Sequence, residues 1–388
     1  MFKRIVAIGL IFVFTSVAWL GLAALIQFRT QSAYRGLWGE VAELWGGEHH
    51  QRAPRIHYRQ GSREVEVIPS SSRIAVSFDL DQRKKGLLWY STYGVDFSGS
   101  YTFTNPTDEA REFFVTFVFP TPAAIYDGFR FVVDGQEVDV TDASKNEVET
   151  SVVVGPGETV PVHVSYRSRG LDRWYYSFGE GVSQVKDFRL EMTTDFKAID
   201  FPARTISPSF KEEIPGGWRL VWEHENLISG FQLGMEMPKR LNPGPLASQI
   251  TLFAPVSLLF FFFIVFILSV LRDIRIHPMN YFFLAAAFFS FHLLFAYLVD
   301  HIDVHVAFVL SSLVSVGLVV SYLRLVVGPR FAFVEAGLAQ FIYLVLFSYA
   351  HFFKGFTGLT VTVLSIATLF VLMQLTGRID WEEKFRNP

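Results

Sequence analysis

A short stretch rich in acid and histidine, "DHIDVH" at 300–305, is the densest set of side chains that could do chemistry. Two carboxylates, Asp300 and Asp303, alternate with two imidazoles, His301 and His305. If the segment were helical, the histidines would share one face at i, i+4 spacing, which suits Zn²⁺ or a pH-sensing pair. A plain aqueous turn between two membrane helices needs the same polar residue types. We favour the plain turn over a metal site or a proton-sensitive cluster, and we assign no metal.

Two ionisable residues, His292 and Glu335, lie inside apolar stretches that could cross a membrane. A charged group in the hydrocarbon costs about 2.5–3.5 kcal/mol on insertion scales, so each side chain should face the bundle interior or a wet cavity. Glu335 is expected to pair with Arg330, about one turn away, or to reach the interface. Interhelical hydrogen bonding is the favoured role, and a proton or ion path through His292, Glu335 and Gln340 is the alternative.

The stretch "EHHQRAPRIH" (48–57) contains three further histidines, His49, His50 and His57. A metal would need supporting ligands at fixed spacing, and Glu48 is the only local candidate. We therefore favour an exposed linker over a metal site.

The aromatic run "DRWYYSFG" (172–179) could form a platform for a peptide or a glycan through Trp174, Tyr175 and Tyr176. The same residues are good strand formers and pack well in cores. Packing in a core, or at the membrane interface, is the favoured interpretation.

Two aspartates, Asp195 and Asp200, lie close together in "MTTDFKAIDFP" (192–202). Paired carboxylates indicate a glycosidase only when they converge on a cleft. Turn residues are the simpler interpretation.

The signatures of common enzymes are missing from the sequence. There is no glycine-rich phosphate loop between a strand and a helix, no H-E-x-x-H, no G-x-S-x-G and no EF-hand loop. The absence of cysteine excludes disulfides and thiolate chemistry, and a net charge of −3 gives no indication of a nucleic-acid partner. We therefore expect a protein that is not an enzyme and has no cofactor.

The elements that must position these residues are largely membrane helices. A chain of 388 residues that is 51% hydrophobic, yet 18% charged, must be partitioned between bilayer and water. Six stretches reach the roughly 20 residues that a spanning helix needs, and they lie at about 5–27, 250–271, 279–299, 305–326, 331–352 and 356–376. The first stretch exceeds the ~7–15-residue apolar core of a signal peptide, so we predict an uncleaved anchor.

The distribution of basic residues predicts the orientation. One set of short loops holds nearly all the basic residues, namely Lys3, Arg4, Arg272, Arg275, Arg324, Arg330, Arg378, Lys384 and Arg386. The opposite short loops hold only Lys354. Because basic loops stay on the cytoplasmic side, both termini are predicted to be cytoplasmic and residues 28–248 to lie outside, in a bacterial periplasm.

The last apolar stretch closes on "TGRIDW" (376–381). Arg378 and Trp381 are usual at a membrane boundary, but Asp380 between them is not. We expect Asp380 to latch the last helix to the bundle by pairing with a basic residue of a neighbouring loop. The candidates for that pair are Arg272, Arg275 and Arg330.

The outer region changes its periodicity along the chain. After an anchor at 1–28, residues 29–72 are expected to form a helical or irregular membrane-proximal segment. Short alternating runs separated by turn residues follow over 73–240, which predicts one extended or two consecutive β-modules. Residues 241–388 form the five-helix bundle and a cytoplasmic tail. The predicted fold is thus membrane α-helical, with six transmembrane helices, plus a large all-β, sandwich-like extracytoplasmic domain.

Part of this sequence resembles a known family. The run "HPMNYFFLAAAFFSFHLLFAYLVDHIDVHVAF" (277–308) and the closing "TGRIDW" are similar to the CreD, or colicin-tolerance, inner-membrane proteins. The resemblance is close over 245–388 and looser at "RKKGLLWYSTYGVDFSGSYTF" (83–103). The outer domain is shorter than is usual in the family, Asp300 replaces the more familiar Glu, and Glu382 follows Trp381 where the family has an aromatic residue. The resemblance implies an envelope-integrity protein under stress-response control, with no established catalytic activity.

We therefore expect a non-enzymatic inner-membrane protein that acts in envelope integrity or envelope stress. Its partners would be the lipid bilayer and an unknown envelope protein or cell-wall component, engaged by the β-domain. One alternative is a transporter or channel accessory that uses the polar residues of the bundle. Another is a membrane enzyme at the outer interface, with Asp300 and His301 as the acid/base pair.

Overall fold

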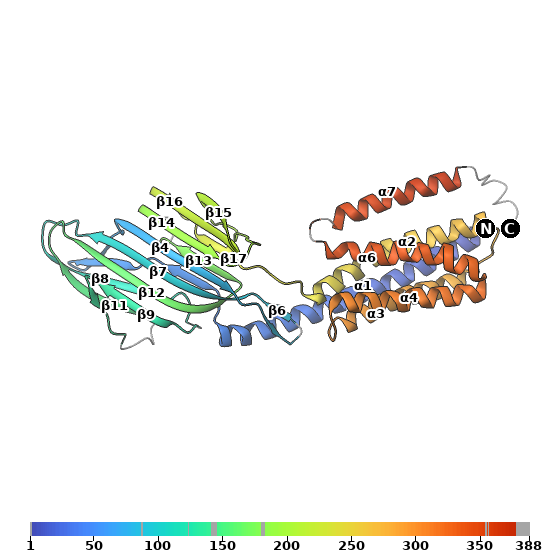
Figure 1. The fold of residues 1–388 in the computed structure, drawn as a ribbon, viewed down its shortest axis with the longest axis horizontal. Coiled ribbons are helices and arrows are strands. Elements are labelled where there is room, and N and C mark those ends of the chain that lie inside the picture. Colours follow the sequence, from blue (N-terminus) through green and yellow to red (C-terminus); the bar gives the residue numbers. More distant parts are fainter. Residues whose placement is uncertain are drawn as a thin grey trace. The chain divides into compact units, whose positions relative to one another are not determined.

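The computed structural model describes residues 2–86, 88–122, 124–140, 146–179, 183–353, 355 and 357–377. The chain divides into two compact units (Figure 1). Residues 1–34 and 241–388 form what we call the helical unit, and residues 35–240 form what we call the β unit.

The helical unit is built from long apolar helices. They are α1 (Phe2–Trp45, whose last turns belong to the β unit), α2 (Pro243–Leu271), α3 (Pro278–Leu298), α4 (Val304–Val326), a composite fifth segment, and α7 (Thr357–Thr376). The fifth segment consists of η1 (Phe331–Ala336), α5 (Gly337–Gln340), η2 (Phe341–Leu346), α6 (Phe347–Tyr349) and η3 (Ala350–Phe352). Within the described residues, six helices are long and apolar enough to cross a membrane.

The fifth segment is not a regular α-helix, because η1 and η2 are π-helical. A π-turn shifts the backbone hydrogen bonds and frees carbonyl oxygens, and such turns often mark functional sites. One carbonyl in η2, that of Tyr343, accepts a hydrogen bond from the Ser257 hydroxyl of α2. The irregular segment is thus bonded to the neighbouring helix.

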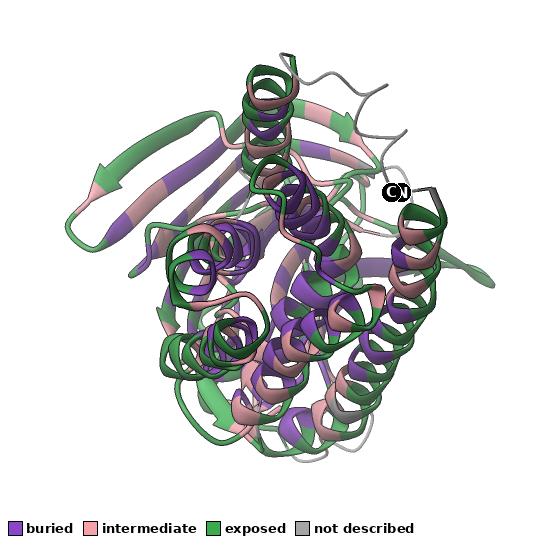
Figure 2. Ribbon diagram, turned by 90° about the vertical axis from the view of Figure 1, so that its right-hand side faces the viewer, coloured by how far each residue is buried: buried purple, intermediate pink, exposed green. Residues whose placement is uncertain are grey.

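The centre of the helical unit is α2. In the most apolar part of α2, 61% of the residues are buried. The corresponding parts of α1 and α7 have only 11% of their residues buried. Figure 2 shows the buried residues gathered on the facing sides of the helices. Aromatic rings fill the interior, as where Phe261 of α2 meets Phe288 of α3 with ring centroids 5.4 Å apart. The outer helices therefore offer most of their apolar surface to the surroundings.

The β unit contains 17 named strands in four sheets. They are β1 (His49–Arg52), β2 (Arg55–Gln60), β3 (Arg63–Glu66), β4 (Ser71–Leu80), β5 (Arg83–Lys85), β6 (Leu88–Tyr90), β7 (Thr92–Thr104), β8 (Arg111–Val118), β9 (Asp127–Val133), β10 (Gln136–Glu137), β11 (Glu147–Val154), β12 (Thr159–Leu171), β13 (Arg173–Ser177), β14 (Ser183–Thr194), β15 (Phe210–Ile214), β16 (Gly217–Ser229) and β17 (Leu233–Glu236).

Two of the sheets pack face to face. The larger has the order β10-β9-β12-β7-β4-β14-β16-β15 and the second has the order β11-β8-β2-β3. Side chains that alternate inward along each strand form the shared core; Phe103 of β7, for example, lies 5.4 Å from Phe113 of β8, centroid to centroid. The remaining sheets are β1-β13-β17 and the β5-β6 hairpin. The expected β-rich, sandwich-like character is present.

The structure differs from the sequence prediction over 29–72. Instead of ending near residue 28, α1 continues to Trp45 and stops at Gly46, whose φ of +91° is a typical helix stop. β1 to β3 and the start of β4 then occupy 49–72, where a helical or irregular segment was expected. In β1 the buried positions are polar, His49 and Gln51, so the apolar alternation of a strand was absent from the sequence.

Gly170 of β12 allows a close approach that any side chain would prevent. A Cβ at this position would lie 2.3 Å from the Tyr93 ring and 2.4 Å from His49 Nδ1. We predict that Gly170→Ala destabilises the protein by about 1–3 kcal/mol through overpacking. Urea unfolding followed by tryptophan emission measures the loss. Gly94→Ala, whose Cβ would meet its nearest atom at 3.7 Å, is the control, and an equal loss in both variants would contradict the argument.

Candidate functional site

The acid–histidine stretch 300–305 forms a turn followed by the start of α4. Because α3 ends at Leu298 and α4 begins at Val304, His301 and His305 do not share a helical face. Asp303 is the N-cap of α4, and its Oδ1 accepts hydrogen bonds from the backbone N–H of His305 (2.9 Å) and of Val306 (3.3 Å). Among the described residues there is no group of three or more His, Cys, Asp or Glu that could hold a metal ion.

The other members of the stretch point to separate partners. The ring of His305 packs against Phe352, with centroids 5.1 Å apart, whereas His301 is exposed. Asp300 forms an ion pair with Arg29 of α1 at 2.9 Å. The structure therefore does not bring the four side chains together.

Sequence reasoning missed Arg29, which contacts the C-terminal end of α3 in three ways. Besides binding Asp300, its Nη2 donates to the Ala296 carbonyl (3.2 Å), and its guanidinium lies 5.4 Å from the centroid of the Tyr297 ring. Carbonyls at a helix C-terminus carry partial negative charge, which a cation stabilises. The available signal was a lone arginine directly after the first apolar stretch.

His292 is buried within the bundle, with 1% of its surface exposed. The indole Nε1 of Trp19, in α1, donates to its Nδ1 at 3.1 Å. The same Nδ1 lies 3.3 Å from the Phe288 carbonyl, which can only accept, so the two contacts favour opposite tautomers of a neutral His292. Its Nε2 is buried and has no hydrogen-bond partner among the described residues.

A second buried imidazole, His351 in η3, was not identified from the sequence. Its Nδ1 lies 3.2 Å from the Phe347 carbonyl, which can only accept, so a neutral His351 carries its proton on Nδ1. Its Nε2 is then an acceptor, again without a partner among the described residues. Each of the two imidazoles therefore has one buried ring nitrogen, Nε2, without a hydrogen-bond partner among the described residues.

Gln340 takes part in a chain of interhelical hydrogen bonds. Its Nε2 donates to Ser315 Oγ of α4 (2.9 Å), and that hydroxyl donates to the Ala287 carbonyl of α3 (2.7 Å). Gln340 thus joins three elements of the bundle. Among the described residues no hydrogen bond joins Gln340 to His292 or Glu335, so these three side chains do not form a continuous hydrogen-bonded path.

Glu335 pairs with a different arginine from the one expected. Its Oε1 lies 2.7 Å from Nη2 of Arg272, at the end of α2, rather than beside Arg330. Proximity in sequence suggested Arg330, but the π-turns of the fifth segment aim the Glu335 side chain at α2. The carboxylate is 12% exposed, so this is a partly buried pair between two helices.

Asp380, together with Arg378 and Trp381, lies outside the described residues. The latch therefore stays a prediction. One of its three expected partners, Arg272, is bound to Glu335.

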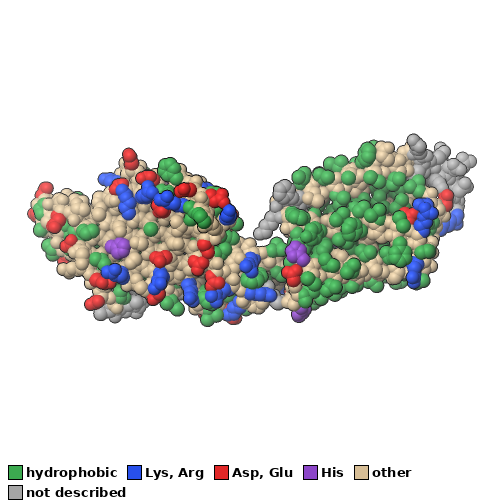
Figure 3. All heavy atoms as spheres, in the orientation of Figure 1, with side chains coloured by type: hydrophobic (Ala, Val, Ile, Leu, Met, Phe, Trp, Pro, Cys, Tyr) green, Lys and Arg blue, Asp and Glu red, His purple; other side chains and the backbone are tan. Residues whose placement is uncertain are grey.

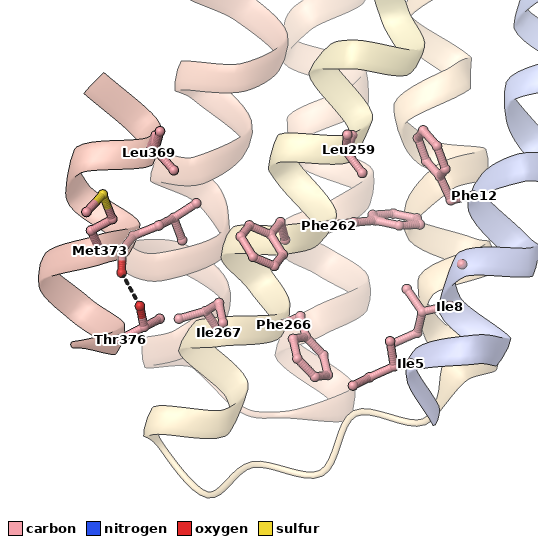
Figure 4. Close-up of a pocket in the computed structure, with 13 residues that line it drawn as sticks. Ile5, Ile8, Phe12, Leu259, Phe262, Phe266, Ile267, Leu369, Met373 and Thr376 are labelled. Atoms are coloured by element: carbon pink, nitrogen blue, oxygen red, sulfur yellow. Dashed lines mark hydrogen bonds between the residues drawn. The ribbon is translucent and has the colours of Figure 1, made fainter. Parts of the chain in front are cut away.

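The bundle also contains an apolar groove between α1 and α7 (Figure 4). Its volume is about 580 Å³, and α2 forms its floor. The lining residues are Ile5, Ile8, Gly9 and Phe12 of α1, Leu259, Phe262, Phe263, Phe266 and Ile267 of α2, and Leu369, Leu372, Met373 and Thr376 of α7. No charged residue lines the groove, which suits an apolar occupant.

In the β unit, His49 lies inside the domain and not in an exposed linker. It is fully buried in β1, with Nδ1 3.0 Å from the Tyr93 hydroxyl and Nε2 3.2 Å from Ser168 Oγ. Burial, helped by the nearby His50, lowers the pKa of His49 to about 3. The imidazole is therefore a neutral structural group at physiological pH.

The two neighbouring histidines have separate environments. His50 is exposed and stacks on Tyr175, with centroids 4.8 Å apart. His57 is buried in β2 and stacks on Phe114 at 5.2 Å. The three histidines do not converge on a shared site.

The aromatic run is divided between core and surface. Trp174 and Tyr176 are 0% and 1% exposed and belong to the core of the β unit. Tyr175 points the other way and is partly exposed. The interpretation as core packing fits two of the three residues, and a continuous aromatic platform is not formed.

The aspartates Asp195 and Asp200 do not form a catalytic pair. Asp200 forms a backbone bridge with Glu236, whereas Asp195 caps the end of β4 by accepting from the Leu80 N–H (3.0 Å). Sequence reasoning missed Asp79, whose pKa is raised because its carboxyl forms a hydrogen bond with Asp195 and is partly desolvated. The parallel pairing of β4 with β14 brings these two carboxyls together.

Comparison with known protein families gives a match to part of the chain. Residues 201–382 match the family model described as "Inner membrane protein CreD". The predicted resemblance is confirmed over that range, while the looser resemblance at 83–103 lies outside it. The match and the apolar helices together show a membrane protein.

Other comparisons add little. No curated protein matches the sequence. Among solved structures, a Legionella pneumophila protein whose description suggests nutrient binding is similar at 13% identity and a TM-score of 0.36, covering 54% of this chain and 75% of its own. A likeness of that level carries no argument about this chain.

The bond between Trp19 and His292 can be measured. We predict a coupling free energy of about 0.5–1.5 kcal/mol in a double-mutant cycle of Trp19→Phe and His292→Leu, because the bond joins two helices away from water. Unfolding of the full-length protein by SDS in mixed micelles provides the free energies. Trp19→Phe combined with Ser321→Ala, an exposed position, should be additive; a coupling no larger than in that control pair would contradict the bond.

The buried His49 predicts a dependence of stability on pH. The pKa of His49 is near 3 in the folded protein and 6.5 in the unfolded chain, so the unfolded state binds more protons between these values. Stability is full above pH 6.5 and falls by about 1.4 kcal/mol per pH unit as the pH drops toward 3. Urea unfolding at pH 7.5 and pH 4.5 measures this fall. His49→Gln should remove about 2–3 kcal/mol of it, and an unchanged pH dependence would refute the assignment.

Proposed function

We propose, from the premise that residues 201–382 carry the membrane module of the CreD family, that this chain is a non-enzymatic inner-membrane protein of the bacterial envelope. The helical unit would cross the bilayer six times, with both termini in the cytoplasm. The β unit would stand on the periplasmic side and engage an envelope component. Its role would be envelope integrity or the response to envelope stress.

The observation that best supports this proposal is the contrast between the surfaces of the two units. Apolar side chains cover the visible face of the helical unit, and charged side chains are spread over that of the β unit (Figure 3). Phe14, Leu313 and Ile366, on α1, α4 and α7, are each more than 60% exposed. Only a lipid environment tolerates apolar exposure on this scale.

The charges at the helix ends support the proposed orientation. Arg4, Arg272 and Arg324 lie at the ends of α1, α2 and α4 that the loop distribution assigns to the cytoplasm. Arg272 pairs with Glu335 and, at the opposite end, Arg29 pairs with Asp300. The number of basic residues at the helix ends, rather than their net charge, supports the assignment of the Arg4 side to the cytoplasm.

The β unit offers a defined surface for a partner. A hollow of about 240 Å³ is lined by Ser177, Phe178, Gly179, Arg204, Ser229, Gly230, Phe231 and Gln232. Phe231 and the adjacent Ile228 are 53% and 69% exposed, although both are large and apolar. Exposed apolar side chains beside a hollow are typical contact residues. We place the contact with the envelope component here.

The enzyme alternative is less well supported, because Asp300 of its proposed acid/base pair forms an ion pair with Arg29. The transport alternative keeps one specific observation, the buried imidazoles of His292 and His351, whose Nε2 atoms have no hydrogen-bond partner among the described residues. Proton flux into proteoliposomes tests that alternative directly.

A test of envelope function distinguishes between these hypotheses. We expect the double variant Ile228→Asp with Phe231→Asp to sensitise cells to detergent about as much as removal of the gene, because both substitutions fill an exposed contact surface with charge. Asp300→Ala with His301→Ala should leave tolerance largely intact, since neither residue lies at the proposed contact surface of the β unit. Survival in graded detergent, with membrane levels checked by immunoblot, is the measurement.

Val153→Asp is the matched control, because Val153 is 71% exposed on β11, in another part of the β unit. A phenotype for the Asp300/His301 variant and none for the Ile228/Phe231 variant would favour a function in the bundle instead.

A further inference from the structure

We propose that the groove between α1 and α7 is a binding site for an anionic phospholipid of the leaflet on the Arg4 side. One acyl chain would lie in the groove, and the phosphate would bind the basic end of α1. This inference requires the helical unit to be embedded in a membrane. It does not depend on whether the β unit binds an envelope component.

The length of the groove along the helix axes fits within one leaflet of the bilayer. On α2 its lining extends from Leu259 to Ile267, and on α1 from Ile5 to Phe12. At 1.5 Å per residue each stretch covers about 10–12 Å, close to half of the ~30 Å hydrocarbon core. Farther along α1 the helix closes against the bundle, where Trp19 is fully buried. A transmembrane helix of a partner would need a groove through the full thickness, whereas an acyl chain needs only one leaflet.

The basic end of the groove comes from the same helical stripe. Positions 4, 8 and 12 repeat every four residues, so Arg4 continues the face of α1 that Ile8 and Phe12 present to the groove. Its guanidinium lies 5.5 Å from the centroid of the Phe266 ring, a groove residue, and its Nη2 donates to Ser269 Oγ at 3.2 Å. Arg4 is therefore held beside the mouth of the groove.

Buried polar atoms gather at the same place. Arg4 Nε is buried and has no hydrogen-bond partner among the described residues. The buried Tyr281 hydroxyl lies beside the Arg4 guanidinium and Ser269. A guanidinium has five N–H donors. That of Arg4 donates to Ser269 Oγ, and its other N–H groups can bind a phosphate oxygen.

Charge selects the lipid class. Lys3 is exposed next to Arg4, and no acidic residue lines the groove. Basic pockets between membrane helices on the cytoplasmic side are suited to anionic headgroups. The phosphodiester of phosphatidylglycerol or cardiolipin fits this mouth, whereas a zwitterionic headgroup brings an ammonium into a basic site.

Native mass spectrometry of the full-length protein in mild detergent tests the proposal. The probes are phosphatidylglycerol and phosphatidylethanolamine with identical acyl chains, added in equal amounts. We expect preferential retention of phosphatidylglycerol and a loss of about fivefold in its occupancy for Arg4→Gln, the value of one basic contact. Arg324→Gln, a basic residue in the last turn of α4 that does not line the groove, should retain the wild-type occupancy.

A second variant tests the groove without changing charge. A Cβ at Gly9 would meet no atom within 4 Å, so Gly9→Leu fills the groove while leaving the helix intact. It should lower the occupancy of phosphatidylglycerol, and Gly21→Leu, equally open but outside the groove, should not. The acyl-free headgroup glycerophosphoglycerol should fail to compete.

Several results would overturn the proposal. These are equal retention of the two lipids, equal losses for Arg4→Gln and Arg324→Gln, no effect of Gly9→Leu, or competition by the acyl-free headgroup. A dimer that disappears with Gly9→Leu would instead assign the groove to a second copy of the chain.

Discussion

Inside a bilayer a polar side chain finds no water, so each one must bind another helix or its own backbone. The helical unit is organised by this constraint. Trp19 attaches α1 to α3 through His292, Gln340 attaches the fifth segment to α4, and Ser257 attaches α2 to the carbonyl of Tyr343. Packing of the aromatic rings stabilises the core but is not directional. The interhelical hydrogen bonds are directional and determine which helix faces are in contact.

The same constraint explains which parts of the protein could be predicted. Long apolar stretches predict helices because a helix satisfies all its backbone hydrogen bonds within one segment, and alternating runs over 73–240 predict strands because their inward faces are apolar. Asp303 acts as a cap, which fits the plain turn favoured for its stretch. Trp174 and Tyr176 are in the core, as their strand propensity suggested.

The features that could not be predicted from the sequence depend on contacts between residues that are distant in the chain. His49 and Gln51 are polar and buried because residues more than a hundred positions later, Ser168 and Tyr166 of β12, form hydrogen bonds with their side chains. Glu335 binds Arg272 rather than Arg330 because π-turns change the direction of its side chain, and composition does not encode those turns. The groove required three helices, from both ends of the chain, to be placed before its lining could be recognised.

The parallel pairings of the β unit have a consequence for how the protein is made. β1 pairs with β13 and one edge of β4 pairs with β14, so these positions wait for strands that are synthesised much later, whereas β2 pairs with β3 and the other edge of β4 pairs with β7. Contacts of such high sequence separation form slowly and leave edges open in the meantime. If the domain crosses the membrane from its N-terminal side, β1 and one edge of β4 emerge long before their partners. Export would then present an unfinished sheet, tethered by α1, that must be shielded from aggregation until β17 has emerged.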